Sequence, residues 1–331
     1  TSIAFAGLSL WGYTTKKDIS AWGSFLIMGV IGLIVAMIVN MFLQSPAMMY
    51  AISMIGVLIF SGTLPATRIV IDLFDPWFVT FARAALATLA AMIVLGCLRR
   101  PMPRHHAKTL FLIGLLLVFG FPGFMAVAMV TVPSAHGGVV LGILPLATAI
   151  FAALFAGERP SLLFWLCGLV GAALIVIFAL RDGEWGFEAG DFWLLAAGLC
   201  AALGYVLSGK LSHFMPGWEV ISWALLLTAP LSFAATFWLW DTPLSSAPPS
   251  HLIAFVYLGL GSMYLGFFAW NTGLKLGGMA RIGQLQLFQT FFTIAIAALV
   301  LNEPITVETL VFALAIFIVV FVGRHARVTT K

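Results

Sequence analysis

The chain has 331 residues, of which 62% are hydrophobic and only 8% are charged, and its formal net charge is +4. Soluble domains contain about 45–50% apolar and about 25% charged residues, so this composition excludes a soluble globular protein and predicts a bundle in contact with lipid. The small positive charge is confined to a few loops, which indicates membrane orientation and gives no reason to expect nucleic-acid binding.

Apolar runs long enough to cross a bilayer, roughly 20 residues, follow one another along the chain. None alternates apolar with polar residues as a barrel strand does, and in lipid only helices and closed barrels satisfy the backbone. We therefore expect an all-α membrane protein, a ten-helix bundle plus one extra N-terminal membrane helix. The first run is named the leader helix and the others helix 1 to helix 10. In chain order the runs are 22–43, 49–71, 77–98, 109–131, 135–157, 161–180, 191–213, 219–240, 251–273, 282–301 and 306–323.

The charged residues lie mostly between these runs and predict the orientation of the chain. A basic cluster at 99–108 separates helices 2 and 3, and an acidic stretch at 182–191 separates helices 5 and 6. Lys and Arg concentrate in cytoplasmic loops, so we expect the basic cluster and the tail after Arg324 to be cytoplasmic and the acidic stretch external. Lys16 and Lys17 would then lie outside, unless the leader helix does not fully cross.

A weak internal repeat appears when the chain is shifted by 145 positions. This shift superimposes residues 136–161 on 281–306 and aligns Glu158 with Glu303. The alternative is chance similarity between two apolar segments. Five helices per copy is an odd number, so the two copies would insert in opposite orientations, which is a common transporter architecture. The expected units are a leader segment at 1–48, a first five-helix repeat at 49–182, and a second repeat with a basic cytoplasmic tail at 183–331.

Three motifs suggest a family. The pattern FSGTLPATRIVI…DPWFVTFARAAL in helices 1 and 2, FAGERPS after helix 4 and LNEPIT after helix 9 resemble the EamA-type branch of the drug/metabolite transporter superfamily. The resemblance covers roughly residues 52–325. It implies a ten-helix inverted-repeat fold, a central cavity, and export or exchange of amino acids or related metabolites.

The first 60 residues or so depart from that family. They resemble a late segment of Bax-inhibitor-type membrane proteins, but lack the earlier helices and the acidic residues of that family's final helices. An ion-leak activity is therefore not carried over. The chain reads either as a fusion of two membrane-protein segments or as a divergent transporter with an extra helix.

Motifs for catalysis or metal binding are missing from the sequence. The three cysteines, Cys97, Cys167 and Cys200, lie in apolar runs without metal-ligand spacing, and we expect free thiols. We find no nucleophile elbow and no phosphate-binding loop. We therefore expect no metal, no cofactor and no enzymatic activity.

Two arginines lie within the predicted spans. An ionisable group inside a membrane costs roughly 2.5–3.5 kcal/mol and indicates function by default. Arg68 lies four residues before Asp72, and pairing with Asp72 near the membrane surface explains it. For Arg83, six residues beyond Trp77, an anion-binding or gating role near the outer mouth of a cavity stands beside a structural one.

Polar residues share one face on each of two otherwise apolar helices. Such faces should point away from lipid, either lining a cavity or forming interhelical hydrogen bonds. A weaker candidate lies on helix 6. With Arg83, the predicted substrate-binding residues are Tyr205 on helix 6, Tyr264, Phe268 and Asn271 on helix 8, and Gln286, Gln289 and Thr293 on helix 9.

These features predict a secondary transporter that exports small amphipathic solutes, such as amino acids or related metabolites, by alternating access. We expect a multi-pass protein of a bacterial-type inner membrane, with membrane lipid and a small-molecule solute as its partners, and a monomer. The alternatives are an exporter of multiple or cationic drugs, and an ion-leak channel suggested by the N-terminal segment.

The carboxylates predict the energy source. Proton-coupled carriers usually need an ionisable group within the membrane, and no Asp or Glu falls in the middle third of any predicted span. We therefore expect a facilitator or exchanger. The alternative is that Glu158 or Glu303, at helix ends, reaches inward and takes a proton.

Overall fold

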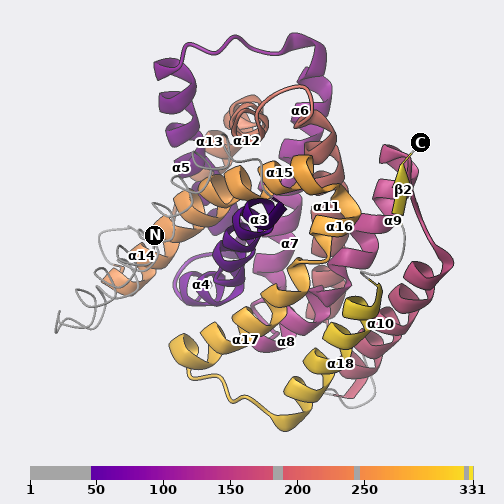
Figure 1. The fold of residues 1–331 in the computed structure, drawn as a ribbon. Coiled ribbons are helices and arrows are strands. Elements are labelled where there is room, and N and C mark those ends of the chain that lie inside the picture. The colour runs from indigo at the N-terminus through magenta and orange to yellow at the C-terminus, as the bar shows by residue number, and fades with distance from the viewer. Residues whose placement is uncertain (1–45, 182–188, 242–246, 324–327, 331) are drawn as a thin grey trace, which may run out of the picture.

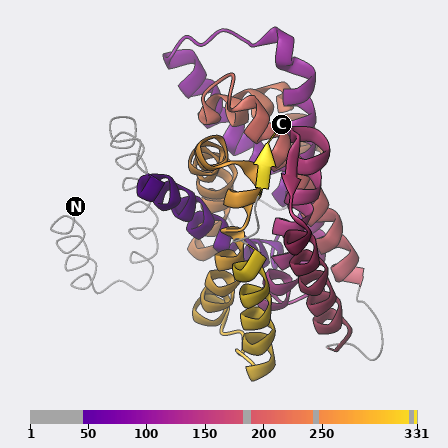
Figure 2. The same ribbon diagram turned by 45° about the vertical axis from the view of Figure 1, so that its right-hand side comes forward.

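The computed structural model describes residues 46–181, 189–241, 247–323 and 328–330. Figures 1 and 2 show long helices packed side by side, with the C-terminal strand beside the end of α9. The leader helix lies outside the described residues. Each of the ten other predicted runs is helical over most of its length, so the all-α class is confirmed apart from one pair of three-residue strands.

Helices 1 to 5 are built from eleven elements, several of which are breaks within one helix. Their bounds are α3 (Pro46–Ser61) and α4 (Thr63–Ile71) for helix 1; α5 (Pro76–Cys97) for helix 2; η1 (Arg104–His106), α6 (Ala107–Ile113), the π-helix η2 (Gly114–Gly120) and α7 (Phe121–Ala128) for helix 3; α8 (Ser134–Val140), η3 (Leu141–Ile143) and α9 (Leu144–Ala156) for helix 4; and α10 (Leu162–Arg181) for helix 5.

Helices 6 to 10 are interrupted in a similar way. Their bounds are α11 (Ala189–Leu211) for helix 6; α12 (Gly217–Leu227) and α13 (Ala229–Trp238) for helix 7; α14 (Pro249–Val256), the π-helix η5 (Tyr257–Leu265) and α15 (Gly266–Gly277) for helix 8; α16 (Met279–Gly283) and α17 (Gln286–Leu301) for helix 9; and α18 (Val307–Gly323) for helix 10. The strands β1 (Glu158–Pro160) and β2 (Val328–Thr330) pair antiparallel.

Length and composition agree with a membrane location. Within the described residues, six helical stretches are long and apolar enough to span a bilayer, and α12 with α13 makes a seventh if this pair, bent by 51°, is one span. Two further apolar helices, Phe288–Leu301 and Val307–Val319, are shorter. Large apolar side chains such as Phe237, 85% exposed, and Leu299, 78% exposed, point outward, as lipid contact requires.

The break in helix 1 follows from Pro65. Proline has no N–H, so the Ser61 carbonyl loses its helical donor and accepts instead from the Thr293 hydroxyl of helix 9, at 2.9 Å. The Ile59 carbonyl, one turn before Thr63, accepts from the Tyr257 hydroxyl of helix 8. Side chains of helices 8 and 9 therefore bind carbonyls beside this break.

Helices 4 and 9 share an irregular shape at the predicted repeat spacing. Helix 4 begins at Ser134 and helix 9 at Met279, and each ends in a left-handed residue, Gly157 with φ 72° and Asn302 with φ 56°. All of these equivalences are 145 positions apart. The same shift places η2 on residues 259–265, inside η5.

The two helices also run antiparallel. The α8 segment of helix 4 packs on α17 of helix 9, and α9 packs on α16. The start of each helix therefore lies beside the end of the other.

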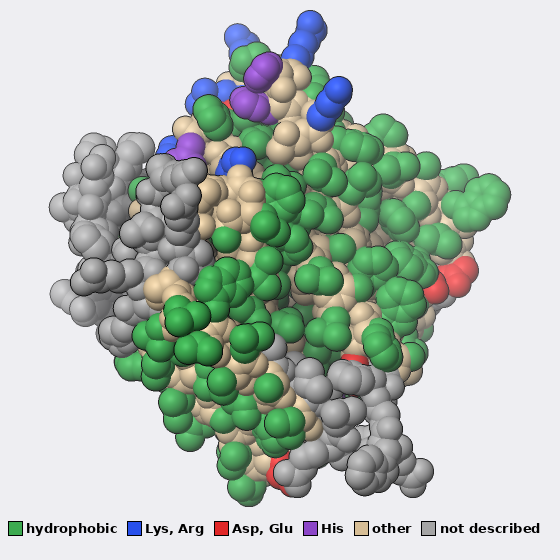
Figure 3. Space-filling view, turned by 90° about the vertical axis from the view of Figure 1, so that its right-hand side faces the viewer, with side chains coloured by type: hydrophobic (Ala, Val, Ile, Leu, Met, Phe, Trp, Pro, Cys, Tyr) green, Lys and Arg blue, Asp and Glu red, His purple; other side chains and the backbone are tan. Residues whose placement is uncertain are grey.

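Contacts between helix ends show which ends share a side of the bundle. Arg100, in the basic cluster, lies 3.3 Å from Glu219 at the start of helix 7, and His251, at the start of helix 8, lies 4.0 Å from Asp72. Both pairings are those that strict alternation of ten spans requires. In Figure 3, Lys and Arg gather at one end of the visible face, above a largely hydrophobic wall.

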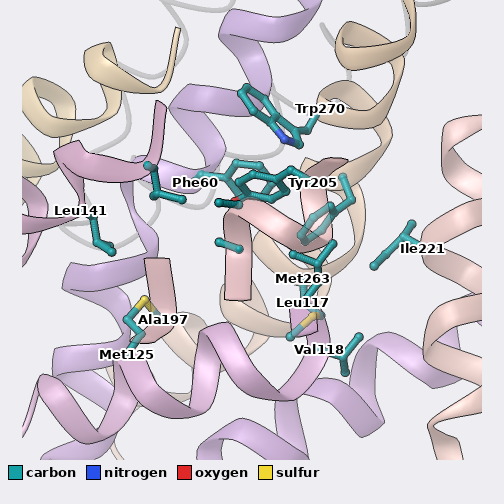
Figure 4. Packing of buried hydrophobic residues seen from close by; sticks show 14 of the residues in the cluster. Phe60, Leu117, Val118, Met125, Leu141, Ala197, Tyr205, Ile221, Met263 and Trp270 are labelled. Atoms are coloured by element: carbon teal, nitrogen blue, oxygen red, sulfur yellow. The ribbon is translucent and has the colours of Figure 1, made fainter. Parts of the chain in front are cut away.

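The core contains an aromatic cluster where helices 1, 6 and 8 meet. The Trp270 ring lies 5.4 Å from that of Tyr205 and 6.1 Å from that of Phe60, centroid to centroid, and Figure 4 shows the three side chains gathered together. This cluster buries Tyr205, one of the predicted site residues, beside helix 8.

Candidate functional site

A small cavity lies between helices 1, 4 and 9. The space open to the centre of a water molecule is about 10 Å³, roughly the minimum that holds one water. In this conformation the space is therefore too small to hold an amino acid. The lining residues are Leu64 from α4, Gly138, Leu141 and Leu144 from helix 4, and Gln286, Gln289, Thr290 and Thr293 from α17.

Two glutamines in this lining have unmet hydrogen-bonding capacity. Both amide atoms of Gln286 and the Oε1 atom of Gln289 are buried without a hydrogen-bond partner. A buried unsatisfied polar group costs about 1–3 kcal/mol, and such groups are rare and call for an explanation. A bound solute that supplies the missing partners is such an explanation.

The threonines beside them are already bonded. The Thr290 hydroxyl donates to the Gly138 carbonyl at 3.0 Å, and Thr293 donates to Ser61 as described above. Gly138 permits this approach of helices 4 and 9, because a Cβ there would lie 3.1 Å from the Thr293 methyl carbon. The threonines therefore hold the helices together, whereas both amide atoms of Gln286 and the Oε1 atom of Gln289 have no partner.

The predicted residues of helix 8 lie elsewhere. Asn271 accepts from the Ser208 hydroxyl at 2.9 Å and donates to the Gly217 carbonyl at 3.0 Å, while the Tyr264 and Ser222 hydroxyls are 2.9 Å apart. Phe268 packs on Tyr264, with ring centroids 4.8 Å apart. These contacts join helices 6, 7 and 8, and none of the three residues lines the cavity.

Tyr205 lies between the cavity residues of helix 9 and the aromatic cluster that contains Trp270 of helix 8. Its ring packs on Trp270 in the aromatic cluster, and its hydroxyl approaches the side chain of Gln286 without the geometry of a hydrogen bond. The structure thus brings Gln286, Gln289 and Thr293 together with Tyr205 nearby, and sets Tyr264, Phe268 and Asn271 apart from them.

Arg83 is buried and incompletely paired. Its side chain is 3% exposed, Nη2 donates to the Ser262 hydroxyl at 3.3 Å, and Nε has no partner. The Ser262 hydroxyl also bonds that of Thr63 at 2.7 Å. Among the described residues, no carboxylate lies within ion-pair distance of Arg83.

The expected pairing of Arg68 with Asp72 is wrong. Arg68 donates to the carbonyl of Met129, the residue that follows α7, where the carbonyls at a helix end lack donors and carry the negative end of the helix dipole. Asp72 is exposed and faces His251.

The buried Glu158 and the half-buried Glu303 form a reciprocal contact that has no signal in the sequence. Glu158 accepts from the backbone N–H groups of Met279 and Ala280, both at 3.1 Å. Glu303 accepts from those of Ser134 and Ala135, at 3.0 and 2.9 Å. The carboxylate after helix 4 thus caps the start of helix 9, and the one after helix 9 caps the start of helix 4. We name these contacts the two glutamate caps.

Asp191, which the sequence places at the end of the outer connection, also has a partner far away in the sequence. Asp191 lies in the first turn of α11, is almost fully buried, and its Oδ1 is 2.8 Å from Nε2 of His136. No sequence signal joined these two residues, which are 55 positions apart.

Most of the chain matches one known protein family. The EamA-like transporter family matches residues 46–180 and 188–323, once for each proposed repeat. A protein named uncharacterized transporter YdeK, from Bacillus subtilis, is 40% identical over 272 residues, which cover 82% of this chain and 95% of that relative. A protein named aromatic amino acid exporter YddG, from Ancylobacter novellus, is 31% identical over 210 residues, 60% of this chain and 68% of that relative.

A solved crystal structure of a protein superposes with a TM-score of 0.63 and covers 83% of this chain and 97% of its own. At 24% identity this likeness concerns the fold alone.

The N-terminal segment matches a different family. The family described as inhibitor of apoptosis-promoting Bax1 matches residues 1–66, overlapping the start of the transporter match. The curated relatives that match this segment are covered over only about a quarter of their length, 25–27%. Both resemblances drawn from the sequence are therefore confirmed.

Proposed function

This chain belongs to the EamA-like transporter family, and from that premise we propose that it is a secondary carrier that exports amino acids or related small amphipathic solutes by alternating access. The observation that carries the proposal is the small cavity lined by Gln286, whose amide atoms have no partner, and by Gln289, whose Oε1 atom has none. Neutral amides beside apolar and aromatic side chains suit a solute with both polar and apolar parts. A relative named an aromatic amino acid exporter supports the same solute class.

We propose that the fold is a pair of inverted five-helix repeats, at 49–182 and 183–331. Its support is the set of features that recur at 145 positions: the matching ends of helices 4 and 9, the π-helices, and the two glutamate caps. The two repeats make a complete carrier, so we expect a monomer. The segment at 1–48 belongs to neither repeat.

In this scheme the two glutamate caps close the cavity from opposite sides. Each carboxylate joins the end of a helix in one repeat to the start of a helix in the other, and the caps lie at opposite ends of the antiparallel helix pair. Opening on one side needs one cap to break while the other holds. The structure has both caps formed, which fits an intermediate closed to both sides.

The proposed solute class is tested by uptake into proteoliposomes that contain the purified protein, across a panel of amino acids and cationic drugs. Saturable uptake of amino acids supports the proposal, and uptake of the drugs alone would favour the alternative of a cationic drug exporter. The same assay on a chain without residues 1–48 tests the leader segment, whose loss should leave the solute preference unchanged.

The predicted orientation places the basic cluster inside the bacterial inner membrane. In a chain without its native cysteines, we expect a cysteine at position 104 to resist a membrane-impermeant thiol reagent added from outside. A cysteine at position 186 should react. Strong labelling at 104 would show that the chain is oriented the other way.

We also propose a facilitator or exchanger that runs down the solute gradient. Within the described residues the buried or half-buried carboxylates sit at helix ends. Glu158 and Glu303 accept backbone N–H groups, Asp191 faces His136, and Glu219 faces Arg100. An imposed pH gradient alone should therefore cause no uphill accumulation in proteoliposomes. Accumulation that is lost in Glu158→Gln, Glu303→Gln or Asp191→Asn would overturn this and identify the proton site.

A further inference from the structure

We propose that Arg83 is an anion receptor that binds the carboxylate of the transported solute. The inference rests on the proposed function and narrows it, since it requires a solute with a free carboxylate and excludes cationic drugs that lack one. Its basis is a buried cation with an unpaired donor at the meeting point of two irregular helices.

The energetics of Arg83 require an explanation. Removing a charge from water costs several kcal/mol unless partners replace the lost hydration. The partners that the structure shows for Arg83 are neutral, and its Nε–H is unpaired. Arg83 therefore has the properties of a site that is incomplete without an anion.

The free edge of the guanidinium has the right geometry for a carboxylate. Arginine binds carboxylates through two parallel N–H groups, and the side-on form of this contact uses Nε and Nη2. In Arg83, Nε is free and Nη2 makes only a long contact of 3.3 Å with the Ser262 hydroxyl. A carboxylate at this edge would gain two hydrogen bonds between opposite charges and would replace one long hydrogen bond to a neutral hydroxyl.

The surroundings of Arg83 have the form of a carrier site. Thr63 is the first residue after the break in helix 1, and Ser262 lies within the π-helix η5. π-helical segments occur frequently at functional sites, and discontinuous helices form the solute sites of many carriers. Because one hydroxyl of this pair donates to the other, the proton of the second one is left to donate to an anion bound at Arg83.

This site adjoins the cavity through helix 1. Leu64, the neighbour of Thr63, lines the cavity, and the Thr293 hydroxyl from the same lining bonds the Ser61 carbonyl just before the break. The break in helix 1 therefore separates the anion receptor from the two unpaired glutamines.

The test compares matched acids and amides on the purified full chain in nanodiscs. Equilibrium binding is measured for L-phenylalanine and phenylalaninamide and for L-leucine and leucinamide, with the unchanged chain, Arg83→Gln and Arg83→Lys. The unchanged chain should bind at least one acid tenfold or more tightly than its amide. Arg83→Gln should weaken the acid to the level of the amide while the amide is unaffected.

Arg83→Lys serves as the conservative variant and decides the question should Arg83→Gln not fold. Lysine keeps the charge but loses the paired geometry, so the acid should bind more weakly than to the unchanged chain and still better than the amide. Equal acid affinity in Arg83→Lys and the unchanged chain would overturn the proposal. So would an acid preference that survives Arg83→Gln, or the lack of one in the unchanged chain.

The outcomes also separate this inference from the proposed function. If amino acids are transported saturably but the Arg83 variants do not change the preference for acids, the proposed carrier function is supported and the proposed role of Arg83 is contradicted. If acid binding depends on Arg83 but no amino acid is transported, the anion-binding role of Arg83 is supported and the proposed carrier function is contradicted.

Discussion

Glu303→Gln should shift the chain toward a conformation open to the outside, and Glu158→Gln toward one open to the cytoplasm. Each carboxylate accepts hydrogen bonds from two backbone N–H groups, with N···O distances of 2.9–3.1 Å. A hydrogen bond to a charged group contributes about 1.5–3 kcal/mol to stability. Glutamine retains one acceptor oxygen and loses the charge. A loss of about 1.4 kcal/mol changes a population tenfold.

Accessibility from outside measures this shift. A single cysteine replaces Leu141 in the cavity lining, in a chain without its native cysteines, and reacts with a membrane-impermeant thiol reagent. We expect Glu303→Gln to raise the external labelling rate about tenfold and Glu158→Gln to lower it, so each variant is the matched control of the other. Equal changes in both would show that the glutamate caps stabilise the fold without selecting a side.

Replacing Gln286 and Gln289 together by leucine should abolish transport and leave the fold as stable or more stable. Leucine has a similar volume and removes the buried amide atoms that lack partners, each of which costs about 1–3 kcal/mol. The same change removes the groups proposed to bind the solute. Solute uptake in proteoliposomes should fall at least tenfold while the midpoint of thermal unfolding in detergent stays constant or rises.

Thr88→Val provides a control for that experiment. Thr88 is buried in α5, its hydroxyl donates to the Ala84 carbonyl of the same helix at 2.8 Å, and it is not among the residues that line the cavity. Loss of the Thr88 hydroxyl should lower the midpoint of thermal unfolding slightly and leave solute uptake unchanged. Normal uptake by the double leucine variant would remove the proposed site.

The positions of the helices could be predicted because hydropathy depends on each segment alone. The break in helix 1 is also visible in the sequence, since Pro65 removes a donor wherever it lies in a helix. The π-helices at Gly114–Gly120 and Tyr257–Leu265 have no comparable signal in the sequence.

The candidate site was only partly predictable for the same reason. The spacing of Gln286, Gln289 and Thr293 predicted one polar face, and all three residues line the cavity. The same reasoning grouped Tyr264 and Asn271 with them, but their partners Ser222, Ser208 and Gly217 are 42–63 positions away. Periodicity identifies the polar face of a helix and does not identify what that face contacts.

The internal repeat contained more information than its sequence similarity showed. The 145-residue shift aligned Glu158 with Glu303 as similar residues in similar places, whereas the structure shows that each contacts the other's helix. When two similar helices pack antiparallel, the residue after each helix lies beside the start of the other helix. This reciprocal contact is visible only in the three-dimensional structure.

Counterflow is the most direct test of a carrier that works by alternating access. Proteoliposomes containing the full chain are loaded with unlabelled L-phenylalanine and diluted into a trace of the labelled amino acid, with phenylalaninamide as the control solute. We expect transient, saturable accumulation of label that depends on the unlabelled amino acid inside. Unsaturable flux with an electrical conductance, or no counterflow for any amino acid in the panel, would contradict it.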